Sequence, residues 1–227
     1  PGVGSGTIMN TAVQHTIGGY TLNQANGYMA NMGTLGAILS DEDLIFSDEL
    51  NHASLIDGCR LSRAKCVRFE HANCHDLQEK LSSSKFRHSV VVTDGVFSMD
   101  GDTAPLKEIS EICSKFGAWL MVDDAHGFGV LGRSGGGLVE MLGLAYEQVP
   151  ILVGTFGKSF GTYGAFVAGS EALIESLIQF SRNYIYTTAL PPALAYATSA
   201  SIKIVERESW RPQRVADNVE YFRALAL

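Results

Sequence analysis

Short apolar runs alternate with helix-forming stretches along most of this chain, and that alternation limits the fold more than any other feature. The runs are nearly continuously apolar, which is typical of strands that are covered on both faces of a sheet. They lie at 44–47, 66–69, 89–93, 119–122, 151–153 and 165–168. Strand–helix–strand units in series imply parallel pairing. The sequence therefore predicts an α/β fold with a mainly parallel sheet and helices on both of its faces.

The clearest helical pattern lies between the runs at 89–93 and 119–122. Apolar side chains recur there at the spacing of one helix face, at Ile109, Ile112, Cys113 and Phe116. Pro105 precedes this face and Gly117 follows it, as expected of a helix start and a helix end. Further helices are expected over 26–39, from 170 onward and from 191 to the chain end, with a break at Arg211-Pro212.

The composition is that of a soluble globular protein, with 46% hydrophobic and 18% charged residues. A formal net charge of −7 argues against nucleic acid as the main partner, because phosphate backbones attract basic surfaces. No apolar run approaches the ~20 residues of a membrane span, and the first residues lack the pattern of a signal peptide. The cysteines include no CxxC pair, which fits reduced thiols. We therefore expect a cytoplasmic enzyme with no membrane or nucleic-acid partner.

Acidic residues and a histidine follow the run at 119–122, at Asp123, Asp124 and His126. Open α/β sheets bind ligands at the carboxyl ends of their strands, so this motif is placed for binding. One alternative is a capped turn with solvated acids, which is equally common at strand ends. Another is a metal site on Asp123 and His126, but no other carboxylate cluster would complete it.

Lys158 stands in a glycine-spaced turn after the apolar run at 151–153. The turn is not a P-loop, because GxxxxGK[ST] would need glycine where Leu152 stands. A lysine there could simply be exposed, or could hold a phosphate weakly. Combined with an acid at the end of the preceding strand, it suits pyridoxal phosphate (PLP) chemistry. The amine can form a Schiff base with the aldehyde, and the acid can keep the pyridine nitrogen protonated.

Other residues offer groups that a cofactor of this kind needs. Gly27 opens a helix whose first N–H groups are a ready anion site. The flat ring of His52 could stack on a planar cofactor, and Ser98 and Thr155 offer hydroxyl groups. Each also has a plain structural explanation, as an ordinary helix start, a turn residue or part of a glycine-bounded loop.

Together these residues stand in the order of the fold-type I PLP enzymes: phosphate-binding loop, stacking ring, pyridine acid and lysine. The motifs are NHASLIDG (51–58), TDGVFSMDGD (93–102), MVDDAHGFGVLG (121–132), GTFGKSFGTYGA (154–165) and IYTTALPPA (185–193). They resemble the α-oxoamine synthase family over roughly residues 26–227, and most of all its biotin-pathway branch. The resemblance implies the PLP-binding large domain of the aminotransferase fold, with a seven-stranded sheet.

The resemblance also implies a role for each residue around the cofactor ring. Lys158 would form the Schiff base, and Asp123 would pair with the pyridine nitrogen. His126 and Ser98 would hydrogen-bond the phenolic oxygen of the ring. His52 would stack on the ring face and touch the substrate.

A second set of residues is implied for the cofactor phosphate. The backbone of Gly27 and Tyr28 and the hydroxyl of Thr155 would hold it. Thr187 or Thr188 would reach the phosphate of the other subunit. The resemblance therefore implies a homodimer with shared active sites.

The implied reaction is the decarboxylative condensation of L-alanine with a pimeloyl thioester, carried by CoA or by a carrier protein, to 8-amino-7-oxononanoate. Other α-oxoamine synthases share this core: glycine C-acetyltransferase, 5-aminolevulinate synthase and serine palmitoyltransferase. A different alternative is an incomplete, non-catalytic core that serves as a dimerisation partner. A nucleotide-binding module is disfavoured, because no GxGxxG follows the first apolar run.

The expected domain organisation also follows from the resemblance. Residues 1–25 form an atypical or incomplete N-terminal segment, and 26–190 the PLP-binding large domain. Residues 191–227 are expected to be helices that lead toward a C-terminal small domain. That domain, which supplies the family's arginine for the amino-acid carboxylate, has no counterpart in this sequence.

Overall fold

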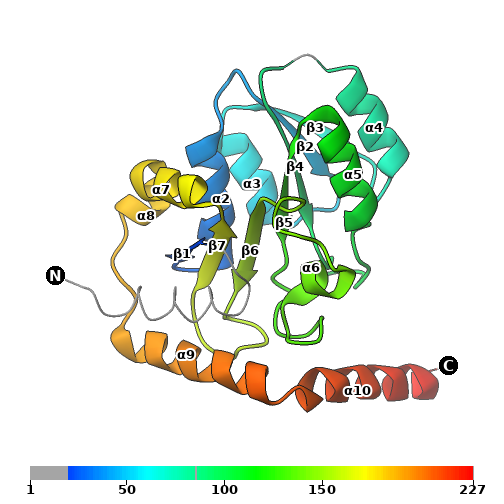
Figure 1. Cartoon of the computed structure of the whole chain (residues 1–227), viewed down its shortest axis with the longest axis vertical. Helices are drawn as coiled ribbons and strands as arrows, with labels where there is room; N and C mark the ends of the chain where they lie inside the picture. The colour runs from blue at the N-terminus through cyan, green and yellow to red at the C-terminus, as the bar shows by residue number, and fades with distance from the viewer. Residues whose placement is uncertain (1–19, 85, 227) are drawn as a thin grey trace.

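The structure is a computed structural model that describes residues 20–84 and 86–226, and these build one seven-stranded sheet with helices on both faces (Figure 1). The strands are β1 (Tyr20–Gln24), β2 (Leu44–Asp48), β3 (Lys65–Phe69), β4 (Ser89–Asp94), β5 (Trp119–Asp123), β6 (Ile151–Thr155) and β7 (Ala165–Gly169). Their order across the sheet is β1-β7-β6-β5-β4-β2-β3. Pairing is parallel from β3 to β6, whereas β7 is antiparallel to both β6 and β1. The predicted α/β class with a mainly parallel, seven-stranded sheet is confirmed.

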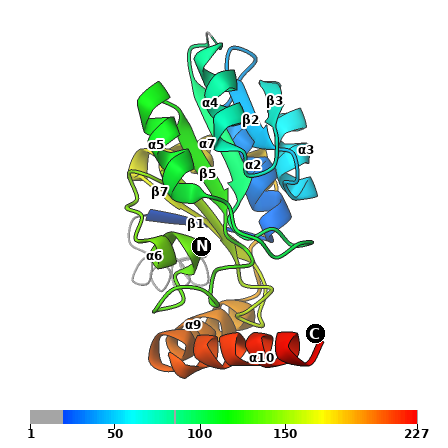
Figure 2. The ribbon, with the colours of Figure 1, turned by 90° about the vertical axis from the view of Figure 1, so that its right-hand side faces the viewer.

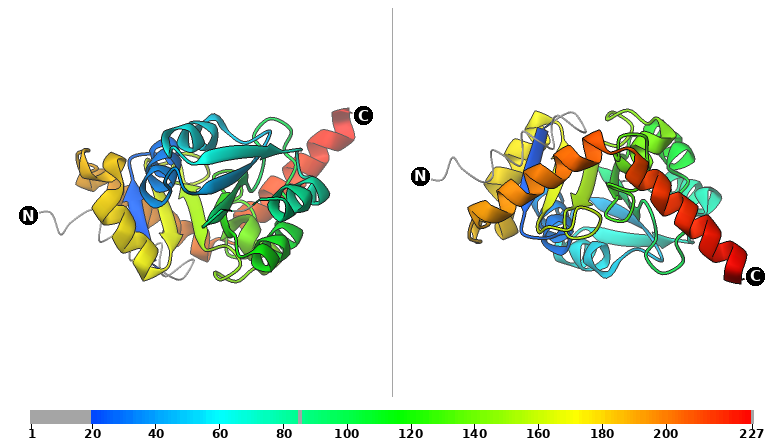
Figure 3. Two further views of the ribbon diagram at one scale, coloured as in Figure 1. Left: turned by 90° about the horizontal axis from the view of Figure 1, so that it is seen from above. Right: turned by 90° about the horizontal axis from the view of Figure 1, so that it is seen from below.

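The helices form a layer on each side of the sheet (Figure 3). One layer holds α2 (Gly27–Ile38), α3 (Ala53–Leu61) and α7 (Glu171–Phe180), with the short α8 (Arg182–Ile185) beside α2 and α7. The other holds α4 (Cys74–Ser82), α5 (Leu106–Phe116) and α6 (Gly137–Leu142). Two last helices, α9 (Pro192–Arg207) and α10 (Trp210–Ala226), run along one end of the molecule (Figure 2). Within the described ranges, no helix is both long enough and apolar enough to cross a membrane.

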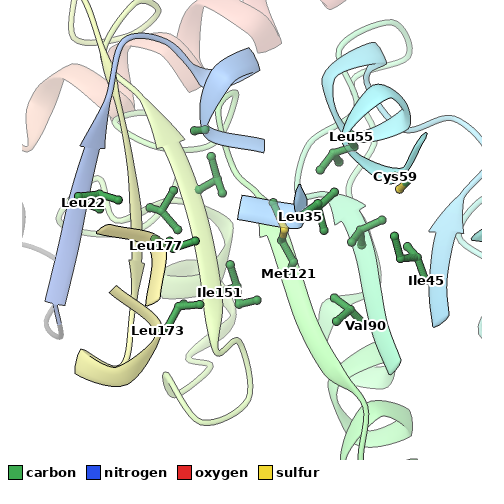
Figure 4. Packing of buried hydrophobic residues seen from close by; sticks show 14 of the residues in the cluster. Leu22, Leu35, Ile45, Leu55, Cys59, Val90, Met121, Ile151, Leu173 and Leu177 are labelled. Atoms are coloured by element: carbon green, nitrogen blue, oxygen red, sulfur yellow. The ribbon is translucent and has the colours of Figure 1, made fainter. Parts of the chain in front are cut away.

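The side chains of alternate strand residues pack into two separate hydrophobic cores, because successive side chains of a strand point to opposite faces of the sheet. In β4, Val90 and Val92 pack toward α2, α3 and α7, whereas Val91 packs toward α4 and α5. Figure 4 shows the first core, where Leu35 of α2 and Leu55 of α3 meet the strands. Each fully buried side chain of this size contributes about 1.5–3 kcal/mol. The sheet is thus a rigid frame for the residues at its strand ends.

A third, aromatic cluster anchors the segments on either side of Lys158. It consists of Phe128, Phe156, Phe160, Phe166 and Ala168 with Ala195 and Ile202 of α9. Phe128 stacks on Phe160 with ring centroids 4.8 Å apart. The rings of Phe156 and Phe160 meet edge to face at 5.6 Å, a favourable aromatic geometry. The turn that carries Lys158 is therefore held between buried rings.

The predicted elements agree with the structure apart from one helix break. All six predicted strands are present as β2 to β7, and α5 begins after Pro105 and ends at Gly117, whose φ is 65°. The edge strand β1 was not predicted, and Leu22 is its only aliphatic residue. No residue range was predicted for the helices α3, α4, α6 and α8. The predicted break at Arg211-Pro212 is wrong: the chain breaks between α9 and α10, and Pro212 lies in the first turn of α10, where no N–H donor is needed.

Asp124 closes the loop that follows β5. Its backbone N–H donates to the carbonyl of Val153 at 2.8 Å, and its Oδ2 accepts from the N–H of Leu138 at 2.6 Å. The intervening Gly137 has φ of 84°, and a Cβ there would overlap Asp124 Oδ2. The loop therefore requires glycine at this position.

We predict that Gly137→Ala lowers the free energy of unfolding more than Gly117→Ala does. Both glycines have positive φ, so alanine costs about 1–2 kcal/mol at either site. Only at 137 does the new methyl group meet an occupied volume, since no atom lies within 4 Å of the corresponding position at 117. Displacing Asp124 would leave a buried group unpaired, at about 1–3 kcal/mol. Urea unfolding followed by circular dichroism measures both variants, and equal losses would contradict this account of the loop.

Candidate active site

The parallel strands end at one edge of the sheet, and a cavity of about 110 Å³ opens there. β4 ends at Asp94, β5 at Asp123 and β6 at Thr155. The first turns of α2 and α3 begin at the same place. The lining residues are Gly27, Tyr28, His52, Ser54, Asp94, Ser98, Asp123, Ala125, His126, Thr155 and Lys158.

The structure brings most of the predicted site residues to this one cavity. They are Gly27, Tyr28, His52, Ser98, Asp123, His126, Thr155 and Lys158. Thr187 and Thr188 lie elsewhere, exposed in the segment between α8 and α9. Their predicted partner is a phosphate in the other subunit, so their place outside this cavity leaves that prediction open. Sequence reasoning missed Ser54, Asp94 and Ala125 as lining residues.

Asp123 is the acid that faces the cavity. It is 5% exposed, and each of its carboxylate oxygens accepts one hydrogen bond. Oδ1 accepts from the backbone N–H of Ala125 at 3.0 Å, and Oδ2 from Nδ2 of Asn31 at 2.5 Å. The neighbouring Asp124 instead turns into the loop toward Leu138. Of the two adjacent acids, only Asp123 lines the cavity.

Asp94 adds a second buried carboxylate to the cavity. It lies opposite Asp123 in the β4–β5 register, and its Oδ2 accepts from the backbone N–H of His52 at 2.6 Å. Burial and, to a lesser extent, the negative charge of Asp123 raise the pKa of Asp94 to about 7, while the His52 backbone hydrogen bond and the charge of Lys158 act in the opposite direction. The sequence signal for this residue was its position directly after an apolar run, the same signal that identified Asp123.

His52 caps the start of α3. Its Nδ1 accepts from the backbone N–H of Ser54 at 3.2 Å and lies 2.7 Å from the Ser54 hydroxyl oxygen. The ring of Tyr28 meets His52 edge to face with centroids 6.5 Å apart. Tyr28 in turn donates its hydroxyl to Asp57, and this hydrogen bond raises the pKa of Tyr28. The orientation of His52 is therefore set by its own helix and by α2.

His126 and Lys158 also line the cavity. Burial lowers the pKa of His126, and the positive charge of Lys158 lowers it further, so the neutral imidazole is favoured. Lys158 is exposed within the turn from β6 to β7. The Lys158 carbonyl accepts from the N–H of Gly161 at 3.0 Å, and the next residue, Ser159, donates its hydroxyl to the carbonyl of Phe128 at 2.6 Å. The backbone of the lysine is thus fixed while its amine is free to reach a ligand.

The first turn of α2 and Thr155 together form an anion-binding corner. The first N–H groups of a helix have no partner within the helix, and they point toward its start. Asn26 caps α2 by accepting from the N–H of Met29 at 2.9 Å. A Cβ on Gly27 would lie 3.8 Å from Cβ of Thr155, so these two residues are close neighbours. The Thr155 hydroxyl donates to the carbonyl of Gly164 at 3.1 Å, and its oxygen accepts from the N–H of Gly157 at 3.3 Å.

The donor set of the cavity fits PLP. The amine of Lys158 suits the aldehyde, and the buried carboxylate of Asp123, with both oxygens oriented, suits the pyridine nitrogen. The neutral imidazole of His126 suits the phenolic oxygen, and the start of α2 beside the Thr155 hydroxyl suits the phosphate. In the described part of the chain, no group of three or more His, Cys, Asp or Glu side chains is arranged to hold a metal ion. The cavity is therefore suited to an organic phosphate cofactor.

Comparison with known proteins shows the family of this chain. The family model described as aminotransferase class I and II matches residues 20–226. The 8-amino-7-oxononanoate synthase of Saccharophagus degradans is 53% identical over 199 residues, which are 88% of this chain and 50% of that protein. The chain thus spans about half the length of the curated relatives it matches.

Solved structures give the same result. The 8-amino-7-oxononanoate synthase from Francisella tularensis superimposes with a TM-score of 0.87 at 36% identity, covering 97% of this chain and 64% of that one. A serine palmitoyltransferase from S. paucimobilis with a bound PLP–myriocin aldimine gives a TM-score of 0.90 at 34% identity, covering 93% and 54%. These neighbours indicate PLP as the cofactor. The chain belongs to the aminotransferase class I and II family, and the resemblance to α-oxoamine synthases that its motifs predicted is confirmed.

Proposed function

We propose that the protein catalyses the PLP-dependent condensation of L-alanine with pimeloyl-CoA, or with a pimeloyl carrier protein, to give 8-amino-7-oxononanoate, carbon dioxide and the free thiol carrier. The observation that carries this proposal is the convergence of Lys158, Asp123, His126 and His52 on one cavity. Relatives that share about half the aligned residues bear the name of that synthase, which supports the choice of substrates.

Bound PLP supplies an aldehyde that an amine can join and a ring that withdraws electrons from the attached carbon. Asp123 would hold the proton on the pyridine nitrogen, since its two oxygens are already oriented by Asn31 and Ala125. An ionised carboxylate at this point keeps the ring electron-poor. His126, favoured as the neutral imidazole, and Ser98 would hydrogen-bond the phenolic oxygen.

Lys158 would act as the base in the proton transfer. Its amine, once displaced by the amino group of alanine, stands at the cavity and can take the proton from the alanine Cα. Its backbone is held by the aromatic cluster and by the Ser159–Phe128 hydrogen bond, so the flexible side chain extends from a fixed point at the cavity. His52 would orient the acyl carbonyl, which the Cα would attack as the thiol leaves. The bond from Cα to the alanine carboxyl group would then break to release carbon dioxide, and a proton would take its place on Cα.

The phosphate would lie at the corner formed by Gly27, Tyr28 and Thr155. We propose that Thr187 or Thr188 of a second copy completes this corner, which makes the functional unit a two-fold dimer. Their exposure in the segment between α8 and α9 supports this assignment. The partners would thus be small molecules, an acyl carrier and a second copy of the chain.

We propose that the large domain comprises residues 26–190 together with β1, which belongs to the same sheet. Residues 191–227 would lead toward a small domain, and the absence of any buried residue in α10 supports this. The four free cysteines support a cytoplasmic location.

A second candidate is the condensation of serine with a long acyl thioester. The similarity of the fold to serine palmitoyltransferase favours it. This second reaction would use every cavity residue in the same proposed role, and it differs only in the amino acid and the acyl chain.

An assay of thiol release separates the two candidates. With PLP and pimeloyl-CoA, we expect alanine to give CoA release well above glycine or serine, and we expect Lys158→Ala to abolish it. Lys158 is the only lysine among the described residues that line the cavity, so the variant leaves none of them to act as the base. Release with serine and palmitoyl-CoA but not with alanine and pimeloyl-CoA would overturn the proposed substrates. Release by Lys158→Ala at the original rate would overturn the catalytic assignment.

The two adjacent acids should respond differently to the same substitution. Asp123→Asn cannot keep the pyridine nitrogen protonated, so turnover should fall by a hundredfold or more, at about 1.4 kcal/mol per tenfold. Asp124→Asn should keep most of the turnover, because Asp124 lies in the loop and outside the cavity. Steady-state kinetics on both variants decide between them. A silent Asp123→Asn with a damaging Asp124→Asn would reverse the assignment.

The shared site predicts that PLP binding depends on the dimer. Thr188→Val should weaken PLP binding, because it removes a hydroxyl near the phosphate but keeps the shape of the side chain. Dilution below the dimer dissociation constant should weaken it in the same way. Light scattering combined with PLP fluorescence titration measures both. A monomer that holds PLP tightly at nanomolar concentration would contradict the shared site.

A further inference from the structure

Asn31 links two cavity residues without lining the cavity itself. It lies in α2 and is fully buried. One N–H of its side chain donates to Ser54 Oγ at 2.8 Å, and the other to Asp123 Oδ2 at 2.5 Å. Both donors of one amide are therefore used, one toward the helix that His52 caps and one toward the acid.

The branch through Ser54 determines the proton position on His52. The backbone N–H of Ser54 donates to His52 Nδ1, so this nitrogen is an acceptor. The Ser54 hydroxyl oxygen accepts from Asn31, and its own hydrogen is available to donate to this acceptor nitrogen, Nδ1, 2.7 Å away. The neutral ring therefore carries its proton on Nε2. His52 can then donate a hydrogen bond to a ligand from Nε2, but it cannot donate one from Nδ1.

The branch through Asp123 determines which way the Asn31 amide faces. In the opposite orientation, the amide oxygen would lie 2.5 Å from a carboxylate oxygen, and two acceptors would repel each other. The observed orientation leaves Asn31 Oδ1 buried, with no partner found among the described residues. An unpaired buried acceptor is destabilising, so this amide is better explained by what its two donors do than by its contribution to folding.

We propose that Asn31 is a positioning residue that couples two groups of the cofactor site. It orients Asp123 as a carboxylate for the pyridine nitrogen, and through Ser54 it holds His52 as the Nε2–H tautomer. This inference rests on the proposed function in one respect, that PLP is the group that both His52 and Asp123 contact. The consequence for the reaction is that His52 acts as a hydrogen-bond donor to the acyl oxygen rather than as a base.

The first test needs no cofactor. In protein labelled with ¹⁵N-histidine, the ring nitrogens of His52 should show the Nε2–H tautomer in NMR spectra near neutral pH. Ser54→Ala should move the ring toward a mixture of tautomers. Thr34→Val serves as the control, because Thr34 is buried in the same helix and its hydroxyl has no partner found in the described structure. A proton on Nδ1 in the unsubstituted protein would overturn the proposal.

The second test measures PLP. Asn31→Leu keeps the approximate size of the side chain but removes both donors, and PLP affinity should fall at least about tenfold, as expected for a lost hydrogen bond to a charged group. The pH dependence of the bound PLP absorbance should shift as well. Asn31→Asp, which is isosteric with asparagine, should weaken binding in the same direction and covers the case in which Asn31→Leu does not fold. Ser54→Ala should lose less affinity, because it keeps the Asn31–Asp123 bond.

The two tests separate this proposal from the proposed function. If the unsubstituted protein does not bind PLP, the proposed function is wrong, and the tautomer test alone decides whether Asn31 positions His52 through Ser54. If the unsubstituted protein binds PLP, but Asn31→Leu and Asn31→Asp match Thr34→Val in affinity and absorbance, Asn31 has no positioning role.

Discussion

The arrangement of the site depends on the parallel pairing of β4 with β5, which places Asp94 opposite Asp123 at the strand ends. Two carboxylates this deep in a protein repel each other and are poorly solvated. The pKa of Asp94, raised to about 7, reflects this unfavourable burial and repulsion. The two carboxylates are nevertheless held close together, because the sheet is fixed by cores on both of its faces. A cavity with this charge distribution favours a cationic ring and an amine, which is what PLP chemistry at Lys158 requires.

The close approach of α3 to α2 is the second constraint, and a glycine makes it possible. A Cβ on Gly58 would lie 2.8 Å from Leu35 Cδ1, closer than real Cβ contacts, and 3.2 Å from the Asn31 carbonyl oxygen, closer than most of them. Because Gly58 has no Cβ, α3 can lie near enough for Ser54 to accept a hydrogen bond from Asn31. Gly58, which does not line the cavity, thereby contributes to the orientation of His52.

Much of the fold and most of the site could be predicted from the sequence, because the residues concerned follow directly after continuous apolar strands. Asp123 and Thr155 stand at strand ends, and the order of motifs along the chain identified Lys158. The hydrogen bonds from Asn31 to Ser54 and Asp123 could not be predicted, because Asn31 and Asp123 meet only after the sheet and α2 have packed. Likewise, β1 carries too few apolar residues to be recognised, since its stability comes from pairing with β7.

The most direct test of the account is chemical trapping of PLP on the protein. Borohydride reduction of the PLP-loaded protein, followed by proteolysis and mass spectrometry, identifies the lysine that holds the cofactor. The account predicts a single label on Lys158, the lysine at the strand-end cavity. A label on an exposed lysine outside the cavity, such as Lys65 or Lys203, with Lys158 unmodified, would contradict it.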